Sequence, residues 1–74
     1  MIRERITEYE AIAAILAHAN VSIDDVRVLD VYIGVHDGVL VWEVVMEIGT
    51  MLIEFYVDIY PSEVVYEQSL AFIP

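Results

Sequence analysis

The stretch VWEVVMEIGTMLIEFYVDIY, residues 41–60, decides the fold. Two apolar runs flank Gly49 and Thr50, and acidic residues interrupt each run. Gly-Thr fits a two-residue type II′ turn with glycine at its first central position. Around such a turn the apolar residues of both runs share one face, and a slip by one residue would destroy that agreement. The stretch therefore predicts a hairpin in which Ile48 faces Met51, Met46 faces Ile53, Val44 faces Phe55 and Trp42 faces Val57.

The residues before and after this hairpin predict two further strands. From Val26 onward apolar residues recur at every second position, as in a strand with one buried face. Asp37-Gly38 is a strong signal for a hairpin turn. After a turn at residues 60–63, a fourth strand is expected at about Val64 to Glu67, and the final SLAFIP is apolar without a clear period. The hairpin around Asp37-Gly38 is predicted to pair Val35 with Leu40, Ile33 with Trp42, Val31 with Val44 and Leu29 with Met46.

A single helix is predicted ahead of the strands. Thr7 and Glu10 are spaced as a capping box, in which each side chain binds the other residue's backbone amide. Asn20 is suited to end a helix in the left-handed conformation. We expect a helix from Glu8 to Ala19 that covers one face of a four-strand antiparallel meander, an α+β two-layer sandwich. The predicted core consists of Ile12, Ile15, Leu16, Val31, Ile33, Trp42, Val44, Met46, Phe55 and Val57.

The composition narrows the class of protein. With 74 residues the chain is expected to form one domain, residues 1–74, and it has no cysteine for a disulfide. A hydrophobic content of 59% means that either the core is unusually rich or apolar surface is left for a partner. Three Lys+Arg against thirteen Asp+Glu give a net charge of −10, which argues against a nucleic-acid partner. No apolar run reaches the ~18 residues of a membrane span, so we expect no membrane insertion.

The second face of the predicted sheet alternates acids with apolar and aromatic residues. The acids either keep the chain soluble or attract a cationic partner or a metal ion. Some of the apolar and aromatic residues of this face, together with residues of the C-terminal segment SLAFIP, are expected to form a protein-contact surface. The alternative is that they are scattered surface residues without a role. The face comprises Asp30, Tyr32, Val41, Glu43, Val45, Glu47, Leu52, Glu54, Tyr56 and Asp58. The candidate contact residues are Tyr32, Val41, Val45, Leu52, Tyr56, Leu70, Phe72 and Ile73.

The sequence carries no catalytic or metal-binding pattern. Asp58 is expected near Glu43 and Asp30, and such a cluster can act as acid and base, bind calcium or remain solvated. We expect it to remain solvated, because no His, Cys, Ser or Lys accompanies it, and Asp58 is also placed to accept turn amides. His18 and His36 are far apart, which disfavours a shared metal ion. The chain is therefore expected to be non-enzymatic, without catalytic residue, metal or cofactor.

The order of these motifs resembles the PepSY domain. The helix ending in AHA, the VWEV strand, the glycine turn and the EFYVD strand are similar to that family from about Ile6 to Tyr66. Pro61-Ser62 replaces the family's Thr-Gly before the closing strand, and Ile59 replaces its alanine. The resemblance implies a non-enzymatic binding or inhibitory domain of peptidase propeptides and bacterial envelope proteins, and hence an extracytoplasmic location. The matching positions are Trp42, Glu43, Val44, Phe55, Val57, Asp58, Glu63 and Val64.

Two functions remain as hypotheses. The first is a PepSY-type binding or regulatory module that acts on a protein partner, such as a peptidase. The alternative, favoured by the high apolar content and the altered closing turn, is a structural or engineered domain that self-associates without a natural ligand. We also expect a homodimer, formed through the closing strand and tail at residues 64–73. The acidic face is a poorer dimer surface, because Glu43, Glu47 and Glu54 would meet their copies without cations.

Overall fold

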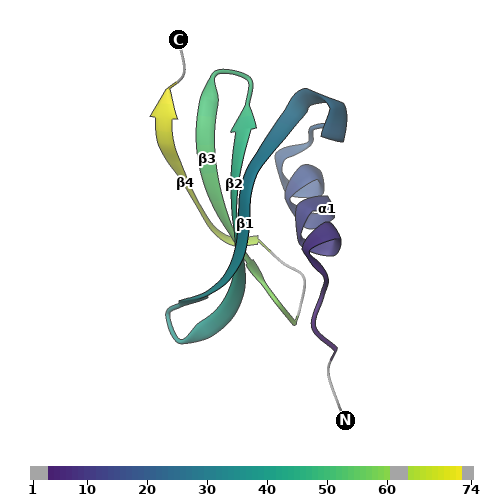
Figure 1. Ribbon diagram of the computed structural model, residues 1–74, viewed down its shortest axis with the longest axis vertical. Coiled ribbons are helices and arrows are strands. Elements are labelled where there is room, and N and C mark those ends of the chain that lie inside the picture. The colour runs from purple at the N-terminus through teal and green to yellow at the C-terminus, as the bar shows by residue number, and fades with distance from the viewer. Residues whose placement is uncertain (1–3, 61–63, 73–74) are drawn as a thin grey trace.

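A computed structural model describes residues 4–60 and 64–72 of the chain. One helix packs on one face of a four-strand antiparallel sheet, as the sequence predicts (Figure 1). The strands lie in the order β1-β2-β3-β4, so the sheet is a meander with β1 and β4 at its edges. The elements are α1 (Glu8–Ala19), the 3₁₀ helix η1 (Ile23–Asp25), β1 (Val26–His36), β2 (Val39–Ile48), β3 (Met51–Asp58) and β4 (Val64–Phe72).

Helix α1 begins and ends where its sequence predicts. The Thr7 hydroxyl accepts a hydrogen bond from the Glu10 amide at 3.2 Å, and the Glu10 carboxylate accepts one from the Thr7 amide at 3.0 Å. Asn20 ends the helix with a φ of 56°, and its amide donates to carbonyls of the last turn. These bonds satisfy backbone groups that a helix end would otherwise leave unpaired. Local sequence therefore accounts for both bounds of α1.

The turns of both hairpins have the predicted geometry. Asp37 and Gly38 have φ values of 51° and 79°, as a type I′ turn requires, and Gly49 has a φ of 60° at the first position of the second turn. All four predicted pairs of the β2–β3 hairpin are confirmed, from Ile48–Met51 to Trp42–Val57. Three of the four predicted β1–β2 pairs are confirmed as well, namely Val35–Leu40, Ile33–Trp42 and Val31–Val44.

The fourth predicted pair between β1 and β2 is wrong. Val28, and not Leu29, faces Met46, because a β-bulge between Val28 and Asp30 adds one residue to β1. Leu29 is consequently 44% exposed instead of lying in the core. Val28 and Leu29 are both apolar, so the period-two pattern could not distinguish the bulged arrangement from the regular one. Beyond the bulge the predicted pairing returns, with Asp30 opposite Val45.

Strand β4 is longer than predicted. It runs through Phe72, whereas the sequence pattern indicated an end near Glu67. Its pairing with β3 shifts register at Val65 and again at Leu70, each of which is an extra residue on β4. An extra residue reverses the alternation of the side chains, so two of them in nine residues hide the period of a strand. This is why SLAFIP shows no clear period although residues 69–72 are strand.

The core lies between α1 and the inner face of the sheet, which is the face toward the helix. The predicted strand register and the apolar residues predicted for the helix identified most of the core. Ile6, Ala11 and Ile59 are also buried, and the sequence pattern did not indicate them. Of the predicted residues, Ile15, Val44, Met46, Phe55 and Val57 are buried, and Ile12, Leu16, Val31 and Trp42 pack against them partly buried.

Ile6 joins the core because backbone hydrogen bonds hold the segment before α1 against the sheet. Its amide donates to the Ile59 carbonyl at 3.0 Å, and its carbonyl accepts from the Trp42 indole Nε1 at 3.0 Å. The indole thus has an apolar body in the core and a satisfied N–H at its rim. A contact between residues so far apart in sequence leaves no local pattern, so sequence reasoning could not find it.

The predicted core residue Ile33 is not in the core. It is 40% exposed, and its neighbours Val35 and Leu40 on the inner face are exposed too. Figure 1 shows the reason, because the β1–β2 hairpin bends away from α1 and carries this part of the inner face beyond the helix. The helix is too short to cover the whole length of β1 and β2.

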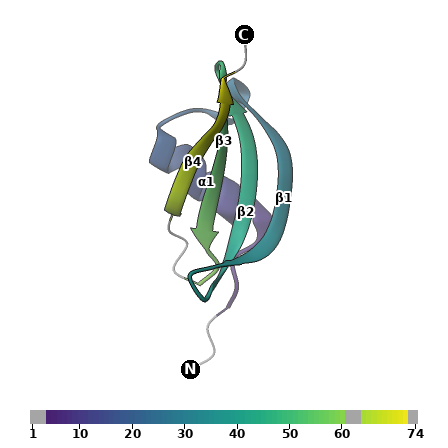
Figure 2. The same cartoon turned by 90° about the vertical axis from the view of Figure 1, so that its left-hand side faces the viewer.

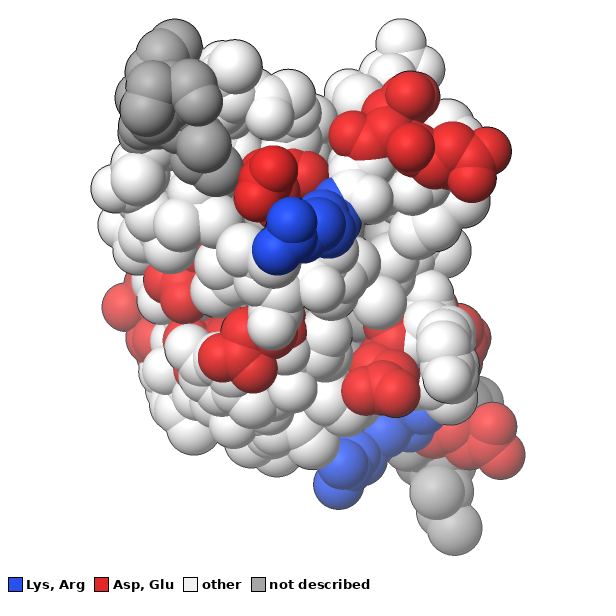
Figure 3. Space-filling view, turned by 45° about the horizontal axis from the view of Figure 1, so that its top comes forward, with Lys and Arg blue, Asp and Glu red and all other residues white. Residues whose placement is uncertain are grey.

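Acidic residues outnumber basic ones on the surface, as expected from the composition (Figure 3). The two contacts between oppositely chargeable groups found among the described residues both use histidine. His18 Nε2 lies 2.8 Å from Glu67 Oε1 and links α1 to β4, and His36 Nε2 lies 3.5 Å from Asp37 Oδ2 in the first turn. Most carboxylates of the described chain therefore face solvent without a cation at salt-bridge distance.

Candidate functional site

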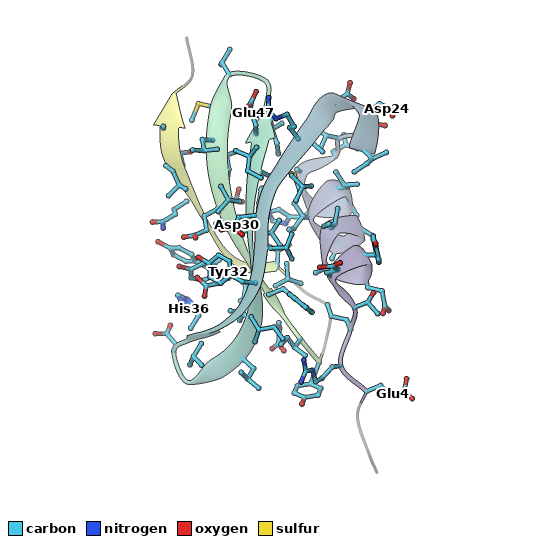
Figure 4. All side chains as sticks on the ribbon, viewed as in Figure 1. Glu4, Asp24, Asp30, Tyr32, His36 and Glu47 are labelled. Atoms are coloured by element: carbon cyan, nitrogen blue, oxygen red, sulfur yellow. The ribbon has the colours of Figure 1, made fainter. Side chains whose placement is uncertain are left out.

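The outer face of the sheet, opposite α1, is the side turned toward the viewer in Figure 2, with the helix behind the strands. The residues predicted for this face are neighbours across the strands, with the pairs Asp30–Val45, Val45–Glu54 and Val41–Asp58. Figure 4 shows Tyr32 and His36 projecting on this side, away from the helix. One row of partners crosses all four strands, and it consists of Tyr32, Glu43, Tyr56 and Tyr66.

Glu54 of β3 is the centre of a hydrogen-bond network on the outer face. Its Oε1 accepts from the Tyr56 hydroxyl at 3.1 Å and from Gln68 Nε2 at 3.0 Å, and its Oε2 accepts from the Tyr32 hydroxyl at 3.4 Å. The Tyr66 hydroxyl extends the network by donating to Gln68 Oε1 at 3.4 Å. All of these donors are uncharged, so they hold the carboxylate in position without cancelling its charge.

Three aromatic rings cluster beside this network. The ring centroid of His36 lies 4.7 Å from that of Tyr56 and 4.9 Å from that of Tyr66, and the two tyrosine rings are 5.2 Å apart. Because β2 lies between β1 and β3, the His36 ring reaches the tyrosines across the strand that carries Val41. Val41 is fully buried, although it belongs to the outer face. The outer face therefore has a small apolar centre of its own, with polar groups of the tyrosines around it.

Gly34 provides room on this face for a second carboxylate. It pairs with Val41 and lies on β1 between the outer-face residues Tyr32 and His36. A Cβ placed on Gly34 would meet the carboxylate of Glu43 on β2. Glu43 thus lies across the glycine, half-buried, instead of extending into solvent. It is a diagonal neighbour of Glu54 on the adjacent strand, a relation that separates two residues by roughly 7–8 Å.

The surroundings of the tyrosines shift their acidity. Burial raises the pKa of Tyr56 to about 12, and the hydrogen bond to Glu54 with the charges of Glu54 and Glu43 acts in the same direction. The pKa of Tyr32 is also raised, first by burial and then by the charges of Glu43 and Glu54. Both hydroxyls therefore keep their protons near neutral pH and remain donors to the network.

The structure places the predicted contact residues in three different situations. Tyr32 is 41% and Leu70 46% exposed, and Val45, Leu52 and Tyr56 are half-buried on the outer face. Val41 has no exposed surface, so a partner could not touch it in this conformation. Only the backbone of Phe72 is described, and Ile73 lies outside the described residues.

Four residues of the hydrogen-bond network and the aromatic cluster were not among the predicted contact residues: His36, Glu54, Tyr66 and Gln68. Period-two alternation along β1 already puts His36 on the same face as Tyr32, but its position at a hairpin end suggested no neighbours. Glu54 was recognised on the face as an acid and not as the acceptor of a network. Tyr66 and Gln68 depend on the register of β4, which the extra residues at Val65 and Leu70 conceal.

The remaining candidate residues have ordinary structural surroundings. The carboxylate of Asp58 accepts the Tyr60 amide at 3.0 Å, as expected for an acid before a turn. His18 and His36 are on different elements, the first on α1 and the second in the aromatic cluster. Within residues 4–60 and 64–72, no group of three or more His, Asp and Glu is arranged to hold a metal ion. The described part of the chain also contains no helix with the length and hydropathy needed to cross a bilayer.

Comparisons with protein-family models, with curated proteins and with solved structures found no match. The similarity to PepSY domains therefore rests on the motifs alone and stays a prediction.

Proposed function

We propose that the chain is a non-enzymatic protein-binding module and that its outer face contacts the partner. The observation that carries the proposal is the asymmetry of the sheet. Much of its inner face is packed against α1, whereas no element of the described chain covers the outer face, where Tyr32, Val45, Leu52 and Tyr56 are partly exposed. Tyrosine beside aliphatic residues is a typical composition for protein interfaces.

A PepSY-type regulatory role is the form of this proposal that the motifs support. In that role the chain would bind or inhibit a protein partner such as a peptidase, in an extracytoplasmic location. The ordered Glu54 network supports binding, because side chains held in one conformation lose little entropy when a partner docks. A turnover assay in which activity depended on Asp58 or His36 would contradict the non-enzymatic assignment.

The test uses the full chain to capture a partner protein, which is then purified. The purified partner is titrated against the unmodified chain and against two matched variants. Leu52→Asn changes the outer face, and Val35→Asn makes the same kind of change on the exposed inner side of the β1–β2 hairpin. We expect the first to weaken binding by about tenfold, which is 1.4 kcal/mol, and the second to leave it unchanged. Equal loss from both variants, or loss from Val35→Asn alone, would contradict the proposed contact face.

Self-association is a second candidate function, supported by a separate observation. The edge strand β4 exposes Val65 and Leu70, and its outer edge has no neighbouring strand among the described residues. Such an edge can pair with a second copy. The extra residues at these same two positions interrupt the regular ladder, which favours contact through the exposed side chains over a continuous intermolecular sheet.

A further inference from the structure

The outer face combines fixed negative charge with aromatic rings. Its carboxylates are Asp30, Glu43, Glu47, Glu54 and Asp58, spread over three adjacent strands. The one arginine that the register puts there, Arg27, lies at the end of the face, opposite Glu47. Around Glu54 and Glu43 the described neighbours supply hydroxyl, amide and imidazole groups and no lysine or arginine.

We propose that this face binds a segment of the partner protein that carries lysine or arginine, an inference that rests on the proposed function. The cationic group lies over the carboxylates of Glu43 and Glu54, on the solvent side of the tyrosine hydroxyls that bind Glu54, and beside the rings of Tyr56 and Tyr66. Charge complementarity selects this occupant. Glu43 and Glu54 are diagonal neighbours on adjacent strands, so one cationic group above them is attracted by both charges.

The rings favour the same occupant as the acids. An ammonium or guanidinium group is attracted to the face of an aromatic ring, most strongly where water is partly excluded. His36 packs against the rings of both Tyr56 and Tyr66, but Tyr66 is still 40% exposed, so a cationic side chain can approach its ring from the solvent side. The Tyr56 hydroxyl donates to Glu54 and the Tyr66 hydroxyl donates to Gln68, so the oxygen of each can still accept a hydrogen bond from an ammonium or guanidinium group.

A second copy of the chain or a neutral apolar partner fits this face less well. A second copy would bring five carboxylates toward five more, with one Arg27 from each copy as the cation that the described register puts there, and like charges at an interface repel each other. A neutral partner would remove Glu43 and Glu54 from water without a counter-charge, which is also unfavourable. A cationic segment turns the same charges into an attraction and accelerates encounter.

The experiment is a titration of the full chain with a short lysine- and serine-containing peptide, read by calorimetry and by NMR. Glu54→Gln keeps the shape of the site and removes its charge, and Glu8→Gln makes the same change on α1. We expect Glu54→Gln to weaken binding by about tenfold or more, and Glu8→Gln by less than about twofold. Shift changes should concentrate at Tyr32, Tyr56 and Tyr66, and thermal unfolding should verify that both variants fold.

Two results would overturn the inference. Equal weakening by Glu54→Gln and Glu8→Gln would mean that the peptide is attracted only by net charge. The second result is that the natural partner loses binding to Leu52→Asn but still binds Glu54→Gln and still binds at elevated salt. In that case the outer face would be the contact surface, as proposed for the function, but its partner would not be cationic. Loss of binding in Glu54→Gln with retention in Glu8→Gln would support both proposals.

Discussion

The carboxylate of Glu43 occupies the position where a side chain on Gly34 would begin. The two residues lie on adjacent strands of the outer face, and the glycine has the extended backbone of β1. Its role is therefore to provide space and not an unusual backbone angle. Because Glu43 lies along the sheet here, its charge is brought close enough to raise the pKa of both Tyr32 and Tyr56.

Gly34→Ala should displace Glu43 without unfolding the chain. The blocking atoms belong to the end of a flexible side chain, so Glu43 can rotate into solvent while the backbone stays in place. Alanine is favoured over glycine inside a strand by roughly 0.5–1 kcal/mol, which offsets the lost contacts. We expect the free energy of unfolding in urea to change by less than about 1 kcal/mol, and the pKa of Tyr56 to fall.

A double-mutant cycle tests the same contact. In a Glu43→Ala background, Gly34→Ala meets no carboxylate and should stabilise the chain by the full strand preference of about 0.5–1 kcal/mol. If Gly34→Ala has the same effect in both backgrounds, the two residues do not interact, and Glu43 is held by other contacts.

The parts of the fold that have a local cause in the sequence could be predicted, and the parts that depend on distant contacts could not. The capping box, the two glycine-containing turns and the period-two strands each have a local cause. The bounds of α1 and the register of β1, β2 and β3 were predicted correctly except at the bulge in β1, whereas β4 extends to Phe72 and not only to about Glu67. Leu29 was missed because Val28 beside it is equally apolar, and the register of β4 was missed because two extra residues hide the period of that strand. Ile33 and Ile6 were missed because the bend of a hairpin and the path of an N-terminal segment depend on distant contacts.

The candidate site was predicted as a face but not as a cluster. Alternation assigned Tyr32, Glu54 and Tyr56 to the same side of the sheet, and the structure brings them into one network. Neither the burial of Val41 nor the contact of the His36 ring with Tyr56 could be predicted from alternation. Alternation fixes the side of a sheet on which a residue lies, whereas curvature decides which residues on that side meet.

The stability of the chain should fall at alkaline pH because of Tyr56. Its pKa of about 12 in the folded chain lies above the ordinary value of 10.0, so the folded state holds this proton more tightly than the unfolded state. The stabilisation is therefore complete below pH 10 and is lost as the pH rises through about 12. Urea unfolding at a series of pH values should show this decline, with a smaller decline in Tyr56→Phe.

The tyrosinate absorbance gives an independent measurement. Titration of the folded chain should show a late component that Tyr56→Phe removes and that Tyr9→Phe, a change of an exposed tyrosine on α1, leaves in place. The late component should also shrink in Glu54→Gln, because the charge and the hydrogen bond that raise the pKa are altered. A titration unchanged in both site variants would show that the Glu54 network does not form.

Phe55→Ala should unfold most of the molecules or bring the chain close to unfolding. Phe55 is fully buried opposite Val44, and such truncations cost about 3–5 kcal/mol. A domain of this size starts near the low end of the usual range of about 5–15 kcal/mol. Tyr9→Ala on the exposed side of α1 is the control and should change stability by less than about 0.5 kcal/mol. Urea unfolding followed by Trp42 fluorescence measures both, and equal effects would contradict the placement of the core.

The last prediction concerns the homodimer expected through β4. Deleting residues 69–74 is a poor test, because Ser69, Ala71 and Phe72 pair with β3 and their loss would weaken the sheet itself. Leu70→Lys is sharper, since Leu70 is an extra residue on the edge strand, is 46% exposed and takes no part in the β3 register. A lysine at an exposed edge is tolerated by the monomer and opposes pairing of two copies.

Light scattering of the full chain should give twice the mass of 8.4 kDa at high concentration, and Leu70→Lys should give the mass of one chain. The control is Tyr56→Ser on the outer face, which should leave the dimer intact, because that face would bring Glu43 and Glu54 against their copies. Retention of the dimer in Leu70→Lys and its loss in Tyr56→Ser would place the contact on the outer face. A single-chain mass for the unmodified protein at high concentration would rule out self-association and leave the outer face for a different protein.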